Sequence, residues 1–342
     1  MKYYVSYEQN SHWITIQAVF QKDSADPEIL QFPSWRPGRY QLGDFAKNVD
    51  RVTATINGEA AEARKVSKDQ WIVDTDQQGE LTVKYRYYAA EMNAGSTYLD
   101  EHILYMNPVN CLIYRTDDQD APCSLSLDVP DEYKIAVGLP VHEKVLSANS
   151  YHELVDSPFV ASKDLEKHSF KVQGVDFHLW LFGEQRLDLE RIERDFTAYT
   201  EAQISDFGEF PVNEYHYLFL LKTFRDYHGV EHQRSTVIVL GPSCELMYEF
   251  YEELLGVSSH ELYHTWNIKA LRPAEMHPYD YSRENYSRLG YVAEGVTTYM
   301  GDKYLFTSGV FNEGQYFTAF NRLLQRHFEN PGRLNYSVAE SS

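Results

Sequence analysis

Two histidines and a glutamate at helical spacing are the residues of this chain whose types are best suited to chemistry. His260 and His264 are four residues apart, so on a helix they share one face, about 6 Å apart along the axis, and can bind one metal ion together. Glu261 follows the first histidine and can reach a water molecule on that ion. Such a set is typical of metal-assisted hydrolysis. The apolar stripe around these residues predicts a continuous helix over 257–268.

A second helical segment, residues 289–300, supplies a candidate third ligand. Glu294 is flanked there by apolar and small residues, an unusual place for a carboxylate without a role. The segment is spaced for an antiparallel return, so Glu294 would complete a His/His/Glu set with one coordination position open for water. The alternative is that these are polar residues on structural helix faces. We predict one Zn²⁺ held by His260, His264 and Glu294, with Glu261 as the general base.

The elements that must position this site begin near residue 166. Asp188–Tyr199 has apolar residues at helical spacing, and Tyr215–Leu221 and Thr236–Leu240 have the composition of strands. Between the two strand candidates lies Gly229-Val230-Glu231-His232. A small sheet that leads into two zinc-binding helices is the thermolysin-like arrangement, and we predict a thermolysin-like zinc metallopeptidase domain over residues 166–342.

The first half of the chain has the pattern of β structure. Apolar residues of Trp13–Phe20 alternate with polar ones, and further strand candidates follow, separated by turn residues such as Asn57-Gly58. An aromatic content of 15%, with 27 tyrosines, also favours strands. We predict an all-β, β-sandwich-like N-terminal domain over residues 1–165, and hence an α+β protein.

The composition of the chain limits the classes of partner that it can bind. The 51 acidic residues outweigh the 31 basic ones, and a net charge of −20 argues against nucleic acid or an anionic membrane as partner. No apolar run is long enough to span a bilayer, and the N-terminus lacks the apolar core of a signal peptide. The three cysteines lack metal-binding spacing, which favours free thiols in a reducing compartment. We therefore expect a cytoplasmic protein whose partner is a peptide substrate, and we leave its oligomeric state open.

The metal-site sequence resembles a known family. His260–Pro273 (HELYHTWNIKALRP) and Tyr291–Asp302 (YVAEGVTTYMGD) closely resemble the M61 peptidases, the glycyl aminopeptidase family, which are gluzincins related to aminopeptidase N. The resemblance continues upstream, in order along essentially the whole chain, through the segments PSWRPGRY from Pro33, FAKNV from Phe45, ELVDSP from Glu153 and GVEH from Gly229.

The resemblance implies a zinc aminopeptidase that removes small, Gly/Ala-like residues from peptides with a free N-terminus. In the related enzymes a Gly-rich edge segment ending in Glu binds the substrate's α-ammonium, which assigns Gly229, Glu231 and His232 to substrate binding. M61 members usually have Gly-Gly before this triplet, whereas here His228 replaces the first glycine. A PDZ domain and an oxyanion-stabilising tyrosine would be expected further downstream, so the resemblance implies a chain truncated within its catalytic domain.

Two other functions stay open at this point. A thermolysin-type zinc endopeptidase would use the same metal site and give Glu231 a different role. A zinc-binding fragment whose catalysis is impaired would keep the metal and lose the turnover.

Overall fold

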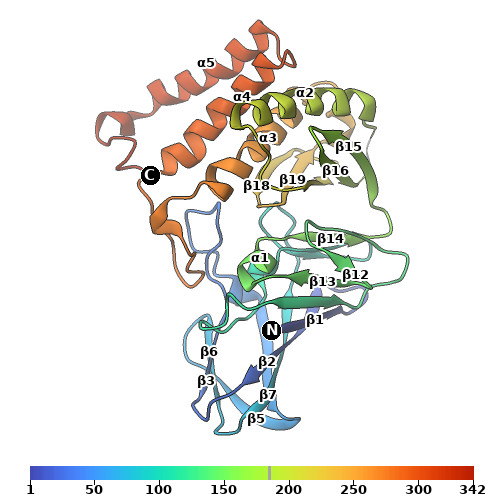
Figure 1. Cartoon of the computed structure of the whole chain (residues 1–342), viewed down its shortest axis with the longest axis vertical. Coiled ribbons are helices and arrows are strands. Elements are labelled where there is room, and N and C mark those ends of the chain that lie inside the picture. The colour runs from blue at the N-terminus through green and yellow to red at the C-terminus, as the bar shows by residue number, and fades with distance from the viewer. Residues whose placement is uncertain (184–185) are drawn as a thin grey trace. The chain divides into compact units, whose positions relative to one another are not determined.

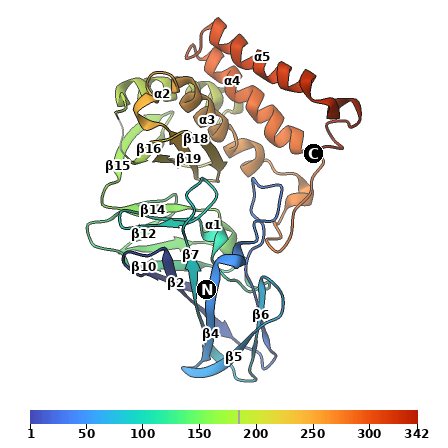
Figure 2. The same cartoon turned by 180° about the vertical axis from the view of Figure 1, so that it is seen from behind.

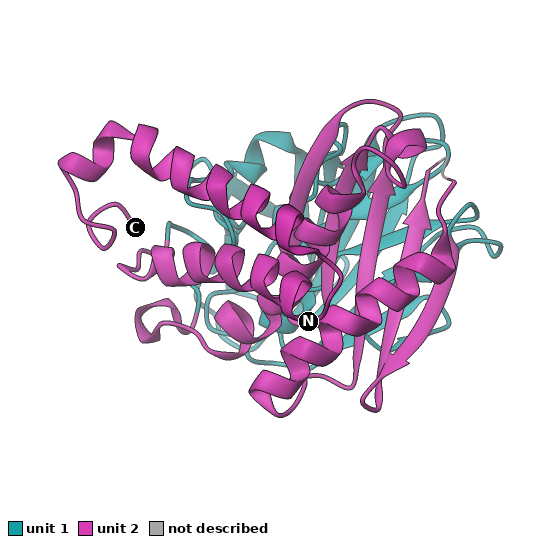
Figure 3. Ribbon diagram, turned by 90° about the horizontal axis from the view of Figure 1, so that it is seen from above, with its two compact units in different colours: residues 1–165, 279–284 teal, residues 166–278, 285–342 magenta. Residues whose placement is uncertain are grey.

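The computed structural model describes residues 1–183 and 186–342, and the chain divides into two compact units (Figure 3). Unit 1 comprises residues 1–165 and 279–284, and unit 2 comprises residues 166–278 and 285–342. The sequence predicted two continuous segments, whereas residues 279–284 interrupt the second one. These residues are anchored in unit 1, where the carbonyl of Tyr281 accepts hydrogen bonds from the backbone N–H groups of Ser34 (2.7 Å) and Trp35 (3.1 Å).

Unit 1 is built from β-strands. Its described residues form one ten-stranded sheet, in the order β12-β13-β10-β1-β2-β7-β4-β5-β6-β3, and one four-stranded sheet, in the order β11-β14-β9-β8 (Figure 1). A single short helix, α1 (Tyr151–Val155), accompanies these strands in the described part of the unit apart from 3₁₀ turns. The strands are β1 (Lys2–Tyr7), β2 (Trp13–Lys22), β3 (Glu28–Gln31), β4 (Val49–Ile56), β5 (Glu59–Lys65), β6 (Gln70–Asp74), β7 (Gly79–Tyr88), β8 (Tyr98–Leu99), β9 (Leu104–Met106), β10 (Cys123–Leu127), β11 (Lys134–Ala136), β12 (Val141–His142), β13 (Val145–Ala148) and β14 (Phe159–Ser162).

The alternation read from the sequence decides which face of the large sheet is buried. On β2, Ile14, Ile16, Ala18 and Phe20 are at most 2% exposed, while their neighbours along the strand are more accessible. β2 pairs antiparallel with β7 over its whole length, so the buried residues of both strands lie on one face. This burial of alternate apolar residues stabilises the sheet.

Unit 2 contains a mixed sheet in the order β15-β16-β17-β19-β18. β16, β17 and β19 are parallel to one another, and β15 and β18 pair antiparallel with their neighbours. The strands are β15 (Glu166–Val172), β16 (Val175–Phe182), β17 (Glu214–Leu221), β18 (Asp226–Glu231) and β19 (Ser235–Gly241), and the helices are α2 (Leu189–Phe207), α3 (Tyr251–Tyr263), α4 (Thr297–Thr307) and α5 (Glu313–Glu329).

Helices α2 and α3 pack on one face of this sheet. Phe196 and Tyr199 of α2 and Leu262 of α3 belong to one buried cluster with Tyr217 and Phe219 of β17. Figures 1 and 2 show α4 beside α3 and α5 beside α4. The predicted helix from Asp188 is longer than expected: the Asp188 side chain caps its first turn, and it ends at Gly208, whose φ of 87° closes the last turn.

The chain is thus a mixed α and β protein with a β-rich N-terminal region. Among the helices of the described residues, none combines the length and the apolar character that crossing a membrane would require.

Candidate metal centre

The predicted histidine pair lies at the end of α3. His260 and Glu261 are in the last turn of that helix, which ends at Tyr263, and His264 follows as its C-cap. The prediction of one continuous helix to residue 268 is wrong, because residues 265–270 form a π-helical segment in which Asn267 has non-helical dihedral angles (φ −113°, ψ 91°). π-Helical turns of this kind often accompany functional sites.

Asn267, at this break in the helix, forms hydrogen bonds to both segments that contain proposed metal ligands. Its carbonyl oxygen accepts a hydrogen bond from Nδ1 of His264 (2.9 Å). Its side-chain Nδ2 donates to the carbonyl of Val292 (2.9 Å) and to Oγ1 of Thr297 (3.0 Å), which flank Glu294. Apolar periodicity gave no sign of this role, and the signal that was available is an asparagine at a site where the backbone must leave the helix.

Glu294 meets the two histidines. It lies in a second π-helical segment, Tyr291–Val296, which leads directly into α4. Nε2 of His260 and Nε2 of His264 are 3.0 Å apart, and each is 3.7 Å from Oε2 of Glu294. Ligand atoms about 2.0–2.1 Å from a tetrahedral zinc ion are separated by roughly 3.3–3.4 Å, so the three residues fit such an ion.

The protonation of His264 suits a ligand. A carbonyl oxygen can only accept, so Nδ1 of the ring carries a proton for Asn267, and the neutral ring keeps a lone pair on Nε2. Burial lowers the pKa of His264 despite the opposing attraction of the Glu231 carboxylate, which favours this neutral form. A metal-binding histidine must be neutral and is held by a hydrogen bond from its other nitrogen.

Small residues bring α4 close to α3. A Cβ placed on Gly301 would lie 3.2 Å from both the Cα and the backbone nitrogen of His260, so a larger residue would push the two helices apart. Oγ of Ser259 donates to the carbonyl of Gly301 (2.9 Å), and Nε2 of Gln203 on α2 donates to that same Oγ (3.0 Å). Three helices thereby fix the position of His260.

The predicted substrate-binding residues lie on the edge strand β18 and its turn. The carboxylates of Glu231 and Glu261 and a ring nitrogen of His264 all lie within 4.8 Å of one another. Both glutamates are buried, with exposed fractions of 6% and 5%. Gly229 packs against the Glu261 side chain, whereas His232 is buried in the turn after β18, where its backbone N–H donates to the carbonyl of Ser235 (2.9 Å).

A second His/Glu group, absent from the sequence analysis, lies on β16 and β17. His178 and His216 are register partners, and Glu214 lies 3.5 Å from Nε2 of the first and 3.6 Å from Nε2 of the second. The indole N–H of Trp180 donates to Nδ1 of His216 (3.1 Å), and Nε2 of the same ring faces Glu214. One ligand atom from each of these three residues lies within 4.8 Å of the other two. The interaction with His216, and to a lesser extent with His178, lowers the pKa of Glu214 to about 2.

Comparison with known proteins agrees with the resemblance seen in the sequence. The peptidase M61 N-terminal domain matches residues 2–163, and the M61 glycyl aminopeptidase domain matches residues 253–342. A search of curated proteins gave no match.

Solved structures share the fold. An aminopeptidase N family protein from Idiomarina loihiensis is similar over 100% of this chain and 60% of its own, with 29% identity and a TM-score of 0.93. This chain therefore spans about 60% of that protein's length. An M1 zinc metallopeptidase from Deinococcus radiodurans is similar over 94% of this chain and 73% of its own, with 14% identity and a TM-score of 0.56.

A further structure, a mutant of the Deinococcus metallopeptidase described as bound to a Tyr-Ser-Ala substrate, has 14% identity and a TM-score of 0.51 with the same coverage. The two domain matches, in order along most of the chain, together with the shared fold and the His/His/Glu geometry, show that this chain is a member of peptidase family M61.

Proposed function

We propose that this chain carries the catalytic site of a zinc-dependent aminopeptidase that removes small, Gly/Ala-like residues from the free N-terminus of peptides. The observation that supports this function best is the cluster of Glu231, Glu261 and His264 within 4.8 Å beside the His260–Glu294 pair. One carboxylate there can serve the proton transfer and another can bind a charged amino end. In this proposal unit 2 is a thermolysin-like catalytic domain.

His260, His264 and Glu294 would hold the zinc ion. A zinc ion bound to two histidines and one carboxylate supplies Lewis-acid polarisation of a carbonyl and lowers the pKa of water toward 7. Glu261 is not one of these ligands, which leaves its carboxylate available as a base.

Side chains and backbone groups of the chain itself would carry out proton transfer and substrate binding. Glu261 accepts a proton from the attacking water and delivers it to the leaving amine. Glu231 binds the substrate's α-ammonium by a charge-assisted hydrogen bond. β18 pairs with one neighbour, β19, in the described sheet, so its other edge can pair with an extended substrate backbone. The preference for small N-terminal residues rests on the glycyl aminopeptidase family to which the catalytic segment belongs.

The metal content of the purified chain tests the first half of this proposal. After dialysis we expect about one zinc per wild-type chain and a large loss in His264→Ala. His327→Ala, an exposed histidine of α5, is the control and should keep the wild-type content. Equal zinc in all three proteins would refute the ligand assignment.

Two matched substrates test the second half. Alanine amide carries the free ammonium that Glu231 would bind, and N-acetylalanine amide does not. An aminopeptidase hydrolyses the first much faster. Comparable hydrolysis of internal bonds in N-acetylated peptides would instead indicate an endopeptidase, and bound zinc without turnover of either substrate would indicate a zinc-binding fragment with impaired catalysis.

A further inference from the structure

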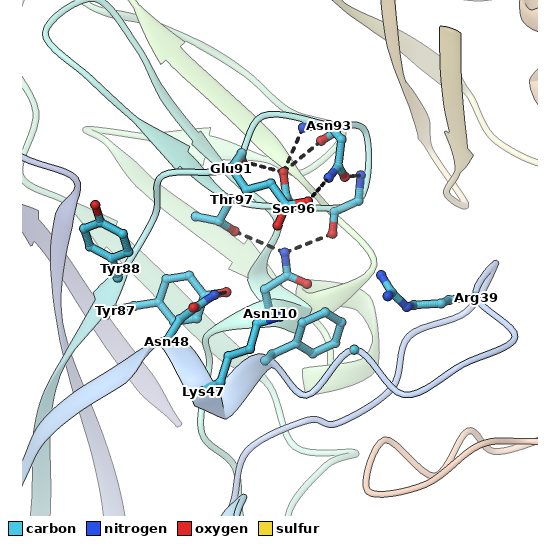
Figure 4. Close-up of a pocket in the computed structure, with 13 residues that line it drawn as sticks. Arg39, Lys47, Asn48, Tyr87, Tyr88, Glu91, Asn93, Ser96, Thr97 and Asn110 are labelled. Atoms are coloured by element: carbon cyan, nitrogen blue, oxygen red, sulfur yellow. Dashed lines mark hydrogen bonds between the residues drawn. The ribbon is translucent and has the colours of Figure 1, made fainter. Parts of the chain in front are cut away.

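A pocket in unit 1 joins two sequence segments to which the proposed reaction assigns no role. Its volume is about 150 Å³. Arg39, from the segment PSWRPGRY, and Lys47 and Asn48, from FAKNV, line one part of it (Figure 4). Other parts are lined by Tyr87 and Tyr88 at the end of β7, by residues of the 91–97 loop and by Asn110. Both segments contributed to the family resemblance, and both line this one pocket.

Two cations of the pocket lack a carboxylate partner. Within residues 1–183 and 186–342, neither Arg39 nor Lys47 forms an ion pair, although the chain has a net charge of −20. Nε of Arg39 is buried and has no hydrogen-bond acceptor among these residues. A buried donor of this kind is costly unless something in the pocket accepts its hydrogen bond.

The floor of the pocket offers an acceptor. Asn110 is 1% exposed, and its Nδ2 donates to the carbonyl of Gly95 (3.0 Å) and to Oγ1 of Thr97 (3.3 Å). These bonds fix the amide so that Oδ1 points away from the loop, and Oδ1 has no donor in the described part of the chain. Figure 4 shows this oxygen on the side that faces Arg39.

The residues that line the pocket also include one carboxylate, that of Glu91. Glu91 lies across the pocket from Lys47 (Figure 4), and its Oε1 accepts a hydrogen bond from Nδ2 of Asn93 (2.6 Å). The pocket therefore presents two cations, one carboxylate and one buried amide oxygen. A simple anion would pair with the two cations but would be repelled by Glu91 and by the amide oxygen of Asn110. A simple amine would bind those two acceptors but would be repelled by the cations.

We propose that this pocket binds a free α-amino acid, whose carboxylate pairs with Arg39 and Lys47 and whose ammonium donates to Asn110 and Glu91. Arginine binds carboxylates by paired, charge-assisted hydrogen bonds. The volume equals that of roughly five liquid water molecules, enough for the head group and a short side chain. All residues that line this pocket belong to unit 1, whereas the proposed metal ligands belong to unit 2.

Binding to the whole chain tests the proposal. The dissociation constants of L-alanine, acetate and ethylammonium are measured by calorimetry, with ligand-observed NMR for weak binding. Alanine should bind at least about tenfold more tightly than either single-charge probe. Arg39→Gln and, independently, the exposed Lys47→Gln should each weaken alanine binding by about tenfold or more, whereas Lys84→Gln, an exposed lysine of β7 outside the pocket, should leave it unchanged.

The same measurements with Glu231→Gln separate this site from the metal centre. If Glu231→Gln abolishes alanine binding and Arg39→Gln and Lys47→Gln do not, the amino acid occupies the metal centre and the proposal is wrong. Acetate binding as tightly as alanine would make the pocket an anion site and would also overturn it, as would the absence of any alanine binding at tens of millimolar.

Discussion

Gly229 on β18 lies directly against the carboxylate of Glu261 on α3. A Cβ placed on Gly229 would be 2.7 Å from Cδ of Glu261, closer still to Oε1, and 2.9 Å from Cγ2 of Val257. Distances under 3.0 Å do not occur for real Cβ atoms, so the edge strand and the proposed general base can approach this closely only because residue 229 is glycine.

Gly229→Ala should therefore displace Glu261 and lower kcat/KM by about 10²-fold or more, because a catalytic group misplaced by about 1 Å can cost that much. Gly256→Ala is the matched control: it lies one turn before His260 on α3, and its Cβ would meet no atom within 4 Å. That variant should keep its activity. Hydrolysis within twofold of wild type for Gly229→Ala would show that the contact does not fix the base.

Glu261→Gln should retain zinc and fold while losing about 10²–10⁴ in kcat, because an amide of the same size cannot accept a proton. Zinc content, circular dichroism and the hydrolysis rate are measured on one preparation. Glu249→Gln, an exposed carboxylate just before α3, should behave as wild type. If Glu261→Gln turned over substrate near the wild-type rate, another residue would be the base.

Asn267→Ala should weaken zinc binding by about 10–100-fold, the usual effect of losing a group that supports metal ligands. The variant loses the hydrogen bonds to Val292 and Thr297 that tie the Glu294 segment to the end of α3. Zinc affinity is measured by competition with a chelator, and Asn335→Ala at an exposed position serves as control. An unchanged affinity would mean that packing alone positions Glu294.

The candidate metal ligands were predicted from local features of the sequence. Two histidines four apart on a helix must share a face, and a carboxylate among small and apolar residues stands out against its surroundings. Likewise, alternation along β2 predicted which of its residues are buried, since the pleat of a strand has a period of two. The resemblance to family M61 rests on these same local segments and is confirmed by the domain matches.

The structural features that the sequence did not predict depend on contacts between residues far apart in the chain. The composition of Asp226–Glu231 did not predict a strand, but this segment pairs with β19 and forms an edge strand despite its polar residues and glycine. The break at Asn267 concerns one residue's dihedral angles, which hydrophobic periodicity does not encode. Tyr281 is buried in unit 1 against rings of Tyr114 and Tyr151, contacts that join residues more than a hundred positions apart.

The interaction of Glu214 with His216 and His178 predicts a specific pH dependence of the free energy of unfolding. The pKa of Glu214 falls from 4.5 to about 2 on folding, so the unfolded chain binds the proton more tightly. Its stabilising effect is therefore fully present above about pH 4.5 and is lost as the pH falls toward 2. Because the carboxylate is nearly half exposed, screening limits the effect to about 1 kcal/mol or less.

Urea unfolding of metal-free protein at several pH values measures this effect. Glu214→Gln should be less stable than wild type at pH 6, and the difference should vanish near pH 2. Glu201→Gln, an exposed carboxylate on α2, should show no such trend. A Glu214→Gln difference that does not change with pH would assign the effect to packing rather than to charge.

In the proposed function, Glu231 recognises the amino end of the peptide. An aminopeptidase must hold a free ammonium one residue from the bond that it cuts, and Glu231 lies within 4.8 Å of both the proposed base Glu261 and the proposed ligand His264. Losing a charge-assisted hydrogen bond to that ammonium costs roughly 1.5–3 kcal/mol. Glu231→Gln should therefore lower kcat/KM on alanine amide by about one to two powers of ten.

The same variant should leave zinc content unchanged and should barely alter any slow hydrolysis of N-acetylalanine amide, which carries no ammonium. The ratio of the two kcat/KM values isolates recognition of the charge, because a defect in the fold or the metal would lower both rates together. An equal loss on both substrates would mean that Glu231 supports the metal centre itself, for example through its attraction for the His264 ring, and the exopeptidase assignment would then lose the residue on which it depends.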